Sequence, residues 1–316
     1  MAKLYIFFIF QTDENHGLAF FEFLTLKNVP KSSSIMRKII VPTDFSDNAF
    51  HALKYACDIF KYERSDIFIL HAFADEVYQQ GNITDRSTLE RHKEQVYQSS
   101  LEELKTLLLK IKEYAPNPRH VYKTIAAFGS LIDEVNDLVD DENIDIVVMG
   151  TRGVANDRSA TFGSNTLYVM KYVQCPVMAI PEDYVFHAPK ELLFPTNYLI
   201  PFKKRELKLL CELSGSFRSA IHMLYIDPLK NLSLRQEDNK TFLKAGLVKA
   251  NLFFETTPEK DKIVAITKYI VHNNIDMLVM VNTRHSHMED IFMQSTVSKL
   301  GLHIKIPFLV LQNLAR

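Results

Sequence analysis

The sequence predicts an α/β protein with two tandem, doubly wound parallel sheets of five strands each. From residue 36 onward, short β-rich runs alternate with amphipathic helical segments, which is the pattern of a parallel sheet covered by helices. The order of these segments repeats in the second half of the chain. The length of 316 residues accommodates two such domains of about 150 residues each.

Five strands are expected in the first half. The run IDIVVM at 144–149 is rich in apolar residues on both of its faces, as expected for a strand covered by helices on both sides. The other four expected strands are 38–42, 66–73, 120–127 and 176–180.

Helices are expected between these strands. Asp44 or Ser46 can cap the first helix, because both side chains accept hydrogen bonds from the free amides of a helix start. Residues 87–114 form a long charged helix whose outer face is expected to be solvated. Gly129-Ser130 opens another helix, and residues 165–172 form the last one.

The second half repeats short stretches of the first in the same order. VPTDF at 41–45 matches FPTNY at 194–198, and NIDIVVM at 143–149 matches NIDMLVM at 274–280. The closing runs CPVMAI and IPFLVL also correspond. An internal duplication over this distance predicts two domains, because solenoid repeats are far shorter. We expect the domains at residues 36–182 and 190–316, with the boundary in the segment between them.

The first 35 residues differ from the rest of the chain. Their apolar run at 4–10 is too short to span a bilayer, and no small-residue cleavage site follows it. Met36 stands directly before a strong strand. We therefore treat residues 1–35 as an N-terminal extension, with the hypothesis that Met36 is the natural start and that the extension comes from an overlong gene assignment.

Charge and cysteine content narrow the classes of protein. The chain has 37 Lys and Arg against 38 Asp and Glu, so no basic excess draws it to nucleic acid or to an anionic membrane. Its three cysteines are scattered and odd in number, without metal-ligand spacing. These features predict a cytoplasmic protein with neither nucleic acid nor membrane as a partner.

A glycine-containing loop after the fourth strand carries the strongest functional signal. It contains Gly150, Gly153, Gly163 and Ser164, and so takes three of only nine glycines in the chain. Ligands of parallel sheets bind beyond the carboxyl ends of the strands, and glycine permits positive φ and close approach of a phosphate. The helix that opens at Gly163-Ser164 presents free amides to an anion. Arg152 either adds positive charge or only faces solvent.

The loop also has an interpretation without a ligand. It could be a surface turn with a glycine cap at the next helix, without a ligand. It does not match a Walker loop, which requires GxxxxGK[ST], or a dinucleotide fingerprint, which requires GxGxxG after the first strand.

The spacing Gly-x2-Gly-x9-Gly-Ser resembles the nucleotide loop of the ATP-binding universal stress proteins. The opening run IVPTDFS at 40–46 and the closing CPV strand are similar to that family too. The resemblance is strong over residues 37–181 and weaker over 190–312. It implies a tandem universal stress protein with a Rossmann-like fold of the adenine-nucleotide alpha hydrolase type.

The resemblance also implies which residues hold the ligand. ATP, with or without Mg²⁺, would lie across the strand ends, and Pro42, Thr43 and Asp44 would hold its adenosine part. Ala72 would contact the adenine through its backbone. The ribose and phosphates would be taken by Met149, Gly150, Gly153, Gly163, Ser164 and Asn165. Asp44 either accepts from a ribose hydroxyl, helps hold Mg²⁺, or only caps the first helix.

The second half departs from this pattern. Asn282, His285, Ser295 and Thr296 stand at the positions of Gly150, Gly153, Gly163 and Ser164, and Asn197 replaces Asp44. Side chains would occupy positions where the backbone approaches phosphate. We therefore expect one competent nucleotide site per chain, with the second half as a packing partner.

Histidines at two places in the chain are candidates for further sites. His285 and His287, with Glu289 and Asp290 nearby, are only a weak metal pattern because no third ligand has a defined spacing. His71 lies on a strand expected to be buried, so it is interpreted as a hydrogen-bonded core residue.

The leading hypothesis is a nucleotide-responsive stress or signalling protein. ATP would order the loop from Gly150 to Gly163 and alter a surface for a partner. Any ATP hydrolysis would be slow, because no general base or Walker lysine is visible. An adenylyl-transferring enzyme and a nucleotide-independent scaffold are the alternatives. The two halves are expected to pair as a pseudo-dimer, with residues 177–180 near 308–311, and two chains could form a homodimer.

Overall fold

The structure, a computed structural model, describes residues 36–79, 85–151, 163–226, 232–283 and 305–313. Contacts place residues 35–316 in one compact unit. The hypothesis about an N-terminal extension lies outside the described residues. The expected division of the chain at 182–190 stays a prediction; those residues lie in the segment that connects the two sets of strands.

The first five strands form a parallel set in the order β3-β2-β1-β4-β5. Each predicted strand is present, with its ends within two residues of the prediction. Because the chain runs outward from β1 through β2 to β3 and then returns to β4 beside β1, strand order reverses between β1 and β4. The strands are β1 Met36–Pro42, β2 Arg64–Ala72, β3 His120–Ala127, β4 Ile146–Gly150 and β5 Val177–Ile180.

Helices connect these strands. The helices are α1 Asp47–Ile59, α2 Ala74–Gln79, α3 Arg86–Tyr114, α4 Leu131–Glu142 and α5 Ser164–Tyr172. Ser46, not Asp44, caps α1, since its side chain accepts from the amide of Ala49. The short helix α2 was not expected from the sequence.

The second half repeats the strand order. Strands β10-β9-β6-β7-β8 follow one another across the sheet, so that β6, β7, β8, β9 and β10 take the places of β1 to β5. The strands are β6 Glu191–Pro195, β7 Ala220–Ile226, β8 Asn251–Thr257, β9 Met277–Thr283 and β10 Phe308–Asn313. The helices described here are α6 Lys204–Phe217, α7 Leu234–Gly246 and α8 Lys262–His272.

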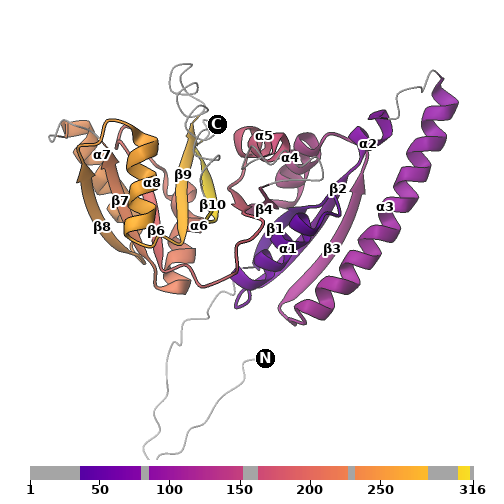
Figure 1. Ribbon diagram of the computed structural model, residues 1–316, viewed down its shortest axis with the longest axis horizontal. Helices are drawn as coiled ribbons and strands as arrows, with labels where there is room; N and C mark the ends of the chain where they lie inside the picture. The colour runs from indigo at the N-terminus through magenta and orange to yellow at the C-terminus, as the bar shows by residue number, and fades with distance from the viewer. Residues whose placement is uncertain (1–35, 80–84, 152–162, 227–231, 284–304, 314–316) are drawn as a thin grey trace, which may run out of the picture. The chain divides into compact units, whose positions relative to one another are not determined.

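The two sets of strands are joined into one ten-stranded sheet (Figure 1). The expected α/β class is confirmed, and the two five-stranded sets are continuous because the closing strands lie together, as expected for residues 177–180 and 308–311. The junction is antiparallel: Phe308 pairs with Ala179 and Val310 with Val177. Both strands are apolar and buried, so each would otherwise leave an edge of unpaired amides and carbonyls.

The hydrophobic core lies in two layers, one on each face of the sheet. One layer contains side chains from α1, α3, α6 and α7, including Leu53, Leu107 and Leu210. The other contains side chains from α4, α5 and α8, including Val135, Val169 and Ile266. Of the helices in the described part of the chain, none combines the length and apolar character of a membrane span.

All three cysteines are buried and free. Burial raises the pKa of the Cys57 thiol to about 12, so this side chain is protonated at neutral pH and is a poor nucleophile.

A buried arginine connects the two halves near the start of β1. The guanidinium of Arg37 lies 2.9 Å from the carboxylates of both Glu63 and Glu212, and Glu212 belongs to α6. Burial alone would lower the pKa of Arg37, but Glu63, Asp145 and Glu212 raise it overall, so the charge is retained. The side chain is only 1% exposed. Its removal would leave carboxylates without their cation.

We predict that Arg37→Met lowers the free energy of unfolding by about 3 kcal/mol, because breaking a buried ion pair leaves uncompensated charge. Urea denaturation measures the change. Arg64→Met is the control, since Arg64 is exposed at the start of the neighbouring strand and should cost less than about 0.5 kcal/mol. Equal losses in both variants would contradict the structural role given to Arg37.

Candidate functional site

The carboxyl ends of β1 and β4 define the candidate site. These two strands pair in parallel at Ile39 with Ile146 and at Ile40 with Val147, so their ends at Pro42 and Gly150 lie at the same edge of the sheet. Strand order reverses between them. Open α/β sheets bind ligands at such a point.

The turn after β1 is held by side chains. The hydroxyl of Thr43 accepts from the amide of Phe45 at 3.0 Å. The carboxylate of Asp44 accepts from the amide and the hydroxyl of Ser46, at 3.2 and 2.6 Å. Asp44 therefore positions the residue that caps α1, rather than capping the helix itself. Phe45 has a φ of 61°, in the left-handed region that a bulky residue enters only when its surroundings enforce it.

His71 stabilises the same turn from β2. Its Nδ1 lies 2.9 Å from the carbonyl oxygen of Thr43, and its ring packs on Phe45 with centroids 4.5 Å apart. Its Nε2 lies 3.1 Å from Glu76, on the unexpected helix α2. With an exposed fraction of 2%, His71 is confirmed as a hydrogen-bonded core residue.

Gly150 ends β4 with no room for a side chain. A Cβ placed there would lie 2.7 Å from Nδ2 and 2.8 Å from Cγ of Asn48, which is buried on α1. No described glycine has a positive φ. Gly150 and Gly163 therefore do not use the positive φ that glycine permits. At Gly150 the requirement is the close approach of Asn48, which the sequence analysis did not identify.

The two ends of the loop that follows β4 are fastened together. The amide of Gly163 donates to the carbonyl of Thr151 at 2.7 Å. The hydroxyl of Thr166 donates to the carbonyl of Gly150 at 3.0 Å. The amide of Thr151 in turn bonds to Ile180 on β5. These bonds fix the start of α5 beside the ends of β4 and β5.

The first turn of α5 presents amides to this edge. Gly163 is the N-cap and has no side chain to cap the helix, whereas Ser46 and Ser130 cap α1 and α4 with their hydroxyls. The amides of Ser164 and Asn165 have no acceptor within the helix. Both residues are exposed. Together with the helix dipole, these amides can bind an anion.

The other expected site residues divide into three groups. Pro42 and Ala72 end β1 and β2 at this same edge. Met149 is 6% exposed and packs in the core, so a ligand would reach it through its backbone. Arg152 and Gly153 lie outside the described residues.

The matching edge of the second half uses its side chains structurally. Asn197 repeats the turn of Asp44, accepting from the amide of Leu199 at 3.0 Å. The strand register corrects one expected match: Val281, not Asn282, stands at the position of Gly150, because Val281 pairs with Leu311 as Gly150 pairs with Ile180. Asn282, one residue further on, donates through Nδ2 to the carbonyls of Met170 and Lys171, at 3.2 and 2.9 Å. Gln312 donates to the same Met170 carbonyl at 2.9 Å. Asn282 and Gln312 thus bind the carboxyl end of α5. Sequence reasoning missed this role, because these contacts join residues over a hundred positions apart.

The histidine pattern considered for a metal, with His285 and His287, lies outside the described residues. Among the residues that the structure does describe, no group of three or more His, Cys, Asp or Glu side chains could hold a metal ion.

The first half of the chain matches a known protein family. The model of the universal stress protein family matches residues 36–181. Universal stress protein MJ0577 of Methanocaldococcus jannaschii is 26% identical over 156 residues, which cover 47% of this chain and 96% of that protein. Universal stress protein YxiE of Bacillus subtilis is 24% identical over 147 residues, covering 46% of this chain and 99% of that protein.

Solved structures share the fold over both halves. A universal stress protein from Archaeoglobus fulgidus superimposes with a TM-score of 0.63 at 17% identity, covering 87% of this chain and 96% of that one. A putative universal stress protein from Pseudomonas aeruginosa gives a TM-score of 0.55 at 11% identity, with 88% and 94% covered. At these identities the likeness concerns the fold.

We predict that Gly150→Ala lowers the free energy of unfolding by about 1–3 kcal/mol, because the new methyl group displaces Asn48 from a packed position. Gly163→Ala should cost less than about 1 kcal/mol, since Gly163 has a φ of −67° that alanine adopts freely. Thermal unfolding of both variants checks this. Equal losses at the two positions would show that Asn48 does not impose the requirement for glycine.

We further predict that Asn282→Gly destabilises the protein by about 1–3 kcal/mol, because the bonds to the end of α5 are lost. Asn282→Ala keeps the Cβ and should lose most of the same stability in urea denaturation. If Asn282→Ala is as stable as the wild type in urea, the loss in Asn282→Gly comes from the flexibility of the glycine backbone and not from those hydrogen bonds.

Proposed function

We propose that this chain, whose residues 36–181 are a universal stress protein domain, binds an adenine nucleotide at the carboxyl edge of β1, β2 and β4. The ligand we propose is ATP, with or without Mg²⁺, and the protein acts as a nucleotide-responsive stress or signalling protein. The observation that carries this proposal is the convergence of the Thr43–Asp44 turn, Gly150 and the uncapped start of α5 at one edge.

The parts of the site suit different parts of such a ligand. The amides of Ser164 and Asn165 would hold phosphate oxygens at the positive end of α5. Gly163 offers no Cβ to obstruct them. Asp44, fixed by Ser46, would accept from a ribose hydroxyl, since its negative charge would repel phosphate. The backbone of Ala72 would contact the base at the end of β2.

We propose binding rather than fast turnover. The carboxylate of Asp44 already accepts two hydrogen bonds from Ser46, which suits a group that holds a ligand better than one that takes up a proton. Any hydrolysis of ATP would then be slow.

We propose one nucleotide site per chain. The second half carries Val281 where the first has Gly150, and Asn197 where the first has Asp44. The repeated strand order and the repeated turns at Asp44 and Asn197 support an internal duplication with the halves paired as a pseudo-dimer. The antiparallel pairing of β5 with β10 supports the same arrangement. A homodimer of such chains remains a proposal from the resemblance alone.

The contacts of α5 suggest how nucleotide binding in the first half would act on the second half. Its first turn would bind phosphate, while its last carbonyls accept bonds from Asn282 and Gln312 of the second half. A shift of this nine-residue helix on ligand binding would therefore act on both ends at once. We also propose a cytoplasmic location, because the three cysteines form no disulfide and free thiols are typical of a reducing compartment.

Calorimetry with ATP tests the site. We expect one equivalent per chain for the wild type and affinity weakened about tenfold or more in Gly163→Val, because a branched side chain would stand where phosphate approaches. Asp44→Asn should weaken binding about fivefold, the difference between a charged and a neutral acceptor. That variant keeps its turn, since Asn197 makes the same turn in the second half.

Asn197→Ala is the matched control and should bind ATP as the wild type does. Two equivalents per chain would refute the proposal of a single site. An affinity unchanged by Gly163→Val would refute the proposed position of the site. A wild-type protein that binds no nucleotide would favour the nucleotide-independent scaffold.

A further inference from the structure

A pocket lies in the second half of the chain, beside the positions that match the turn and the β2 end of the proposed nucleotide site. Tyr198 follows Asn197, and Tyr225 precedes Ile226, which matches Ala72. The pocket has a volume of about 370 Å³ and is formed at the ends of β7 and β8, beside α7. Small-molecule sites occupy roughly 300–1,000 Å³, so the pocket has room for a small ligand. Asn197 and Asn282 are not among its lining residues.

Three aromatic rings line the pocket. Tyr198 packs on Tyr225 with ring centroids 5.7 Å apart and planes 24° from parallel. Phe254 comes from β8. Tyr198 has a φ of 56°, so a strained backbone fixes the place of this ring. Rings in fixed positions provide a surface on which a flat ligand can stack.

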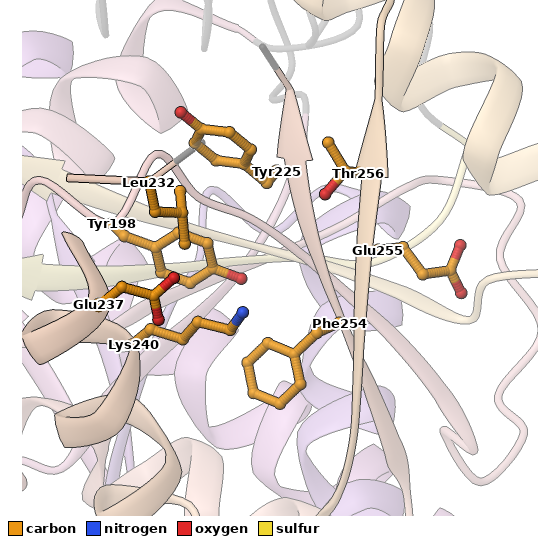
Figure 2. A pocket seen from close by; sticks show the side chains of 8 residues that line it. All are labelled: Tyr198, Tyr225, Leu232, Glu237, Lys240, Phe254, Glu255 and Thr256. Carbon is orange, nitrogen blue, oxygen red and sulfur yellow. The ribbon is translucent and has the colours of Figure 1, made fainter. Parts of the chain in front are cut away.

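Lys240 supplies a positive charge between the rings. Figure 2 shows its ammonium directed toward the space between Tyr198 and Phe254. The ammonium nitrogen lies 5.8 Å from the centroid of Tyr198 and 5.0 Å from that of Phe254. Among the described residues, no carboxylate lies within the 4.0 Å of an ion pair with Lys240. The ammonium is thus placed to receive an anionic group.

Two glutamates also line the pocket, and neither favours a cationic ligand there. The carboxylate of Glu255 points away from the other side chains in Figure 2 and lies 3.7 Å from His222. Glu237 is exposed, so water and salt screen its charge. A cationic ligand would be repelled, because the Lys240 ammonium already occupies the space between the rings.

The corresponding position of the first half is filled. His71 stands where Tyr225 stands in the second half, and it packs against Phe45 and Phe73 and contacts Glu76 of α2. The pair Tyr198–Tyr225 thus repeats the ring pair Phe45–His71, and the second half differs in the pocket with Lys240 near that pair.

We propose that this pocket binds a small planar aromatic compound that carries an anionic group. The anionic group pairs with the Lys240 ammonium between Tyr198 and Phe254, and the aromatic part packs against the rings that line the pocket. Burial, with Glu237 and Tyr225, raises the pKa of Tyr198, so its hydroxyl stays protonated and can donate to the ligand. The second half, which we expect not to bind ATP, thus has a ligand of its own.

The test uses 2-naphthoate and its neutral isostere 2-naphthamide on the full chain, with binding followed by the fluorescence of the naphthyl group. We expect saturable binding of naphthoate to the wild type and about tenfold weaker binding to Lys240→Met, the loss of one charge-assisted bond. Naphthamide should bind both proteins equally. Phe254→Leu should weaken both compounds.

Lys244→Met is the matched control, because the Lys244 ammonium also lies over Phe254, at 4.8 Å, but does not line the pocket. It should bind naphthoate as the wild type does. The proposal is overturned if naphthoate shows no saturable binding, or if Lys240→Met and Lys244→Met bind it equally. Circular dichroism of each variant excludes misfolding as the cause.

Discussion

The antiparallel pairing of β5 with β10 is the constraint on which the arrangement of this protein depends. Each half has its strands parallel, so the carboxyl ends of β1 and β4 lie at one edge of the sheet. Because the junction is antiparallel, the carboxyl ends of β9 and β10 lie at the opposite edge. The two positions that could cradle a phosphate are therefore separated by the full length of the strands.

This separation explains how one helix serves both halves. The helix α5 begins at the carboxyl edge of the first half and runs back to the other edge. There its last carbonyls meet Asn282 and Gln312 at the ends of β9 and β10. A glycine at 282 could not make these contacts. Asn282 thus fixes the end of the helix whose first turn we propose to bind phosphate.

Arg37 adds a second connection between the halves. It lies at the start of β1 and reaches Glu212 on α6. Both connections lie at the edge of the sheet opposite the proposed nucleotide site. The site itself is then left to residues of the first half alone, which is consistent with a family match confined to residues 36–181.

Much of the fold followed from local patterns. Apolar runs predicted the strands of the first half, and matched turns such as VPTDF and FPTNY predicted that the second half repeats the order of the first. The expected proximity of residues 177–180 and 308–311 is observed in the pairing of β5 with β10. The antiparallel direction of that pairing does not follow from local patterns, because it depends on contacts over a hundred residues apart. The helix α2 was missed because it is only six residues long.

The sequence located the candidate site residues in the fold, while their role in binding a ligand stays a prediction. The residues at the ends of β1, β2 and β4 could be located from the order of strands. Why Gly150 is glycine could not, since the constraint is Asn48 from a different element. Likewise the sequence left open whether Asp44 or Ser46 caps α1, because both types of side chain can accept the same bond. The loop residues Arg152 and Gly153 stay predictions.

Amide hydrogen exchange with and without ATP tests the central claim most directly, because it shows where the nucleotide lies. The account predicts slower exchange at the first turn of α5, residues 164–166, and at the turn 43–46, with no change at the matching turn 196–199. Protection at 196–199, or no protection at the start of α5, would contradict it.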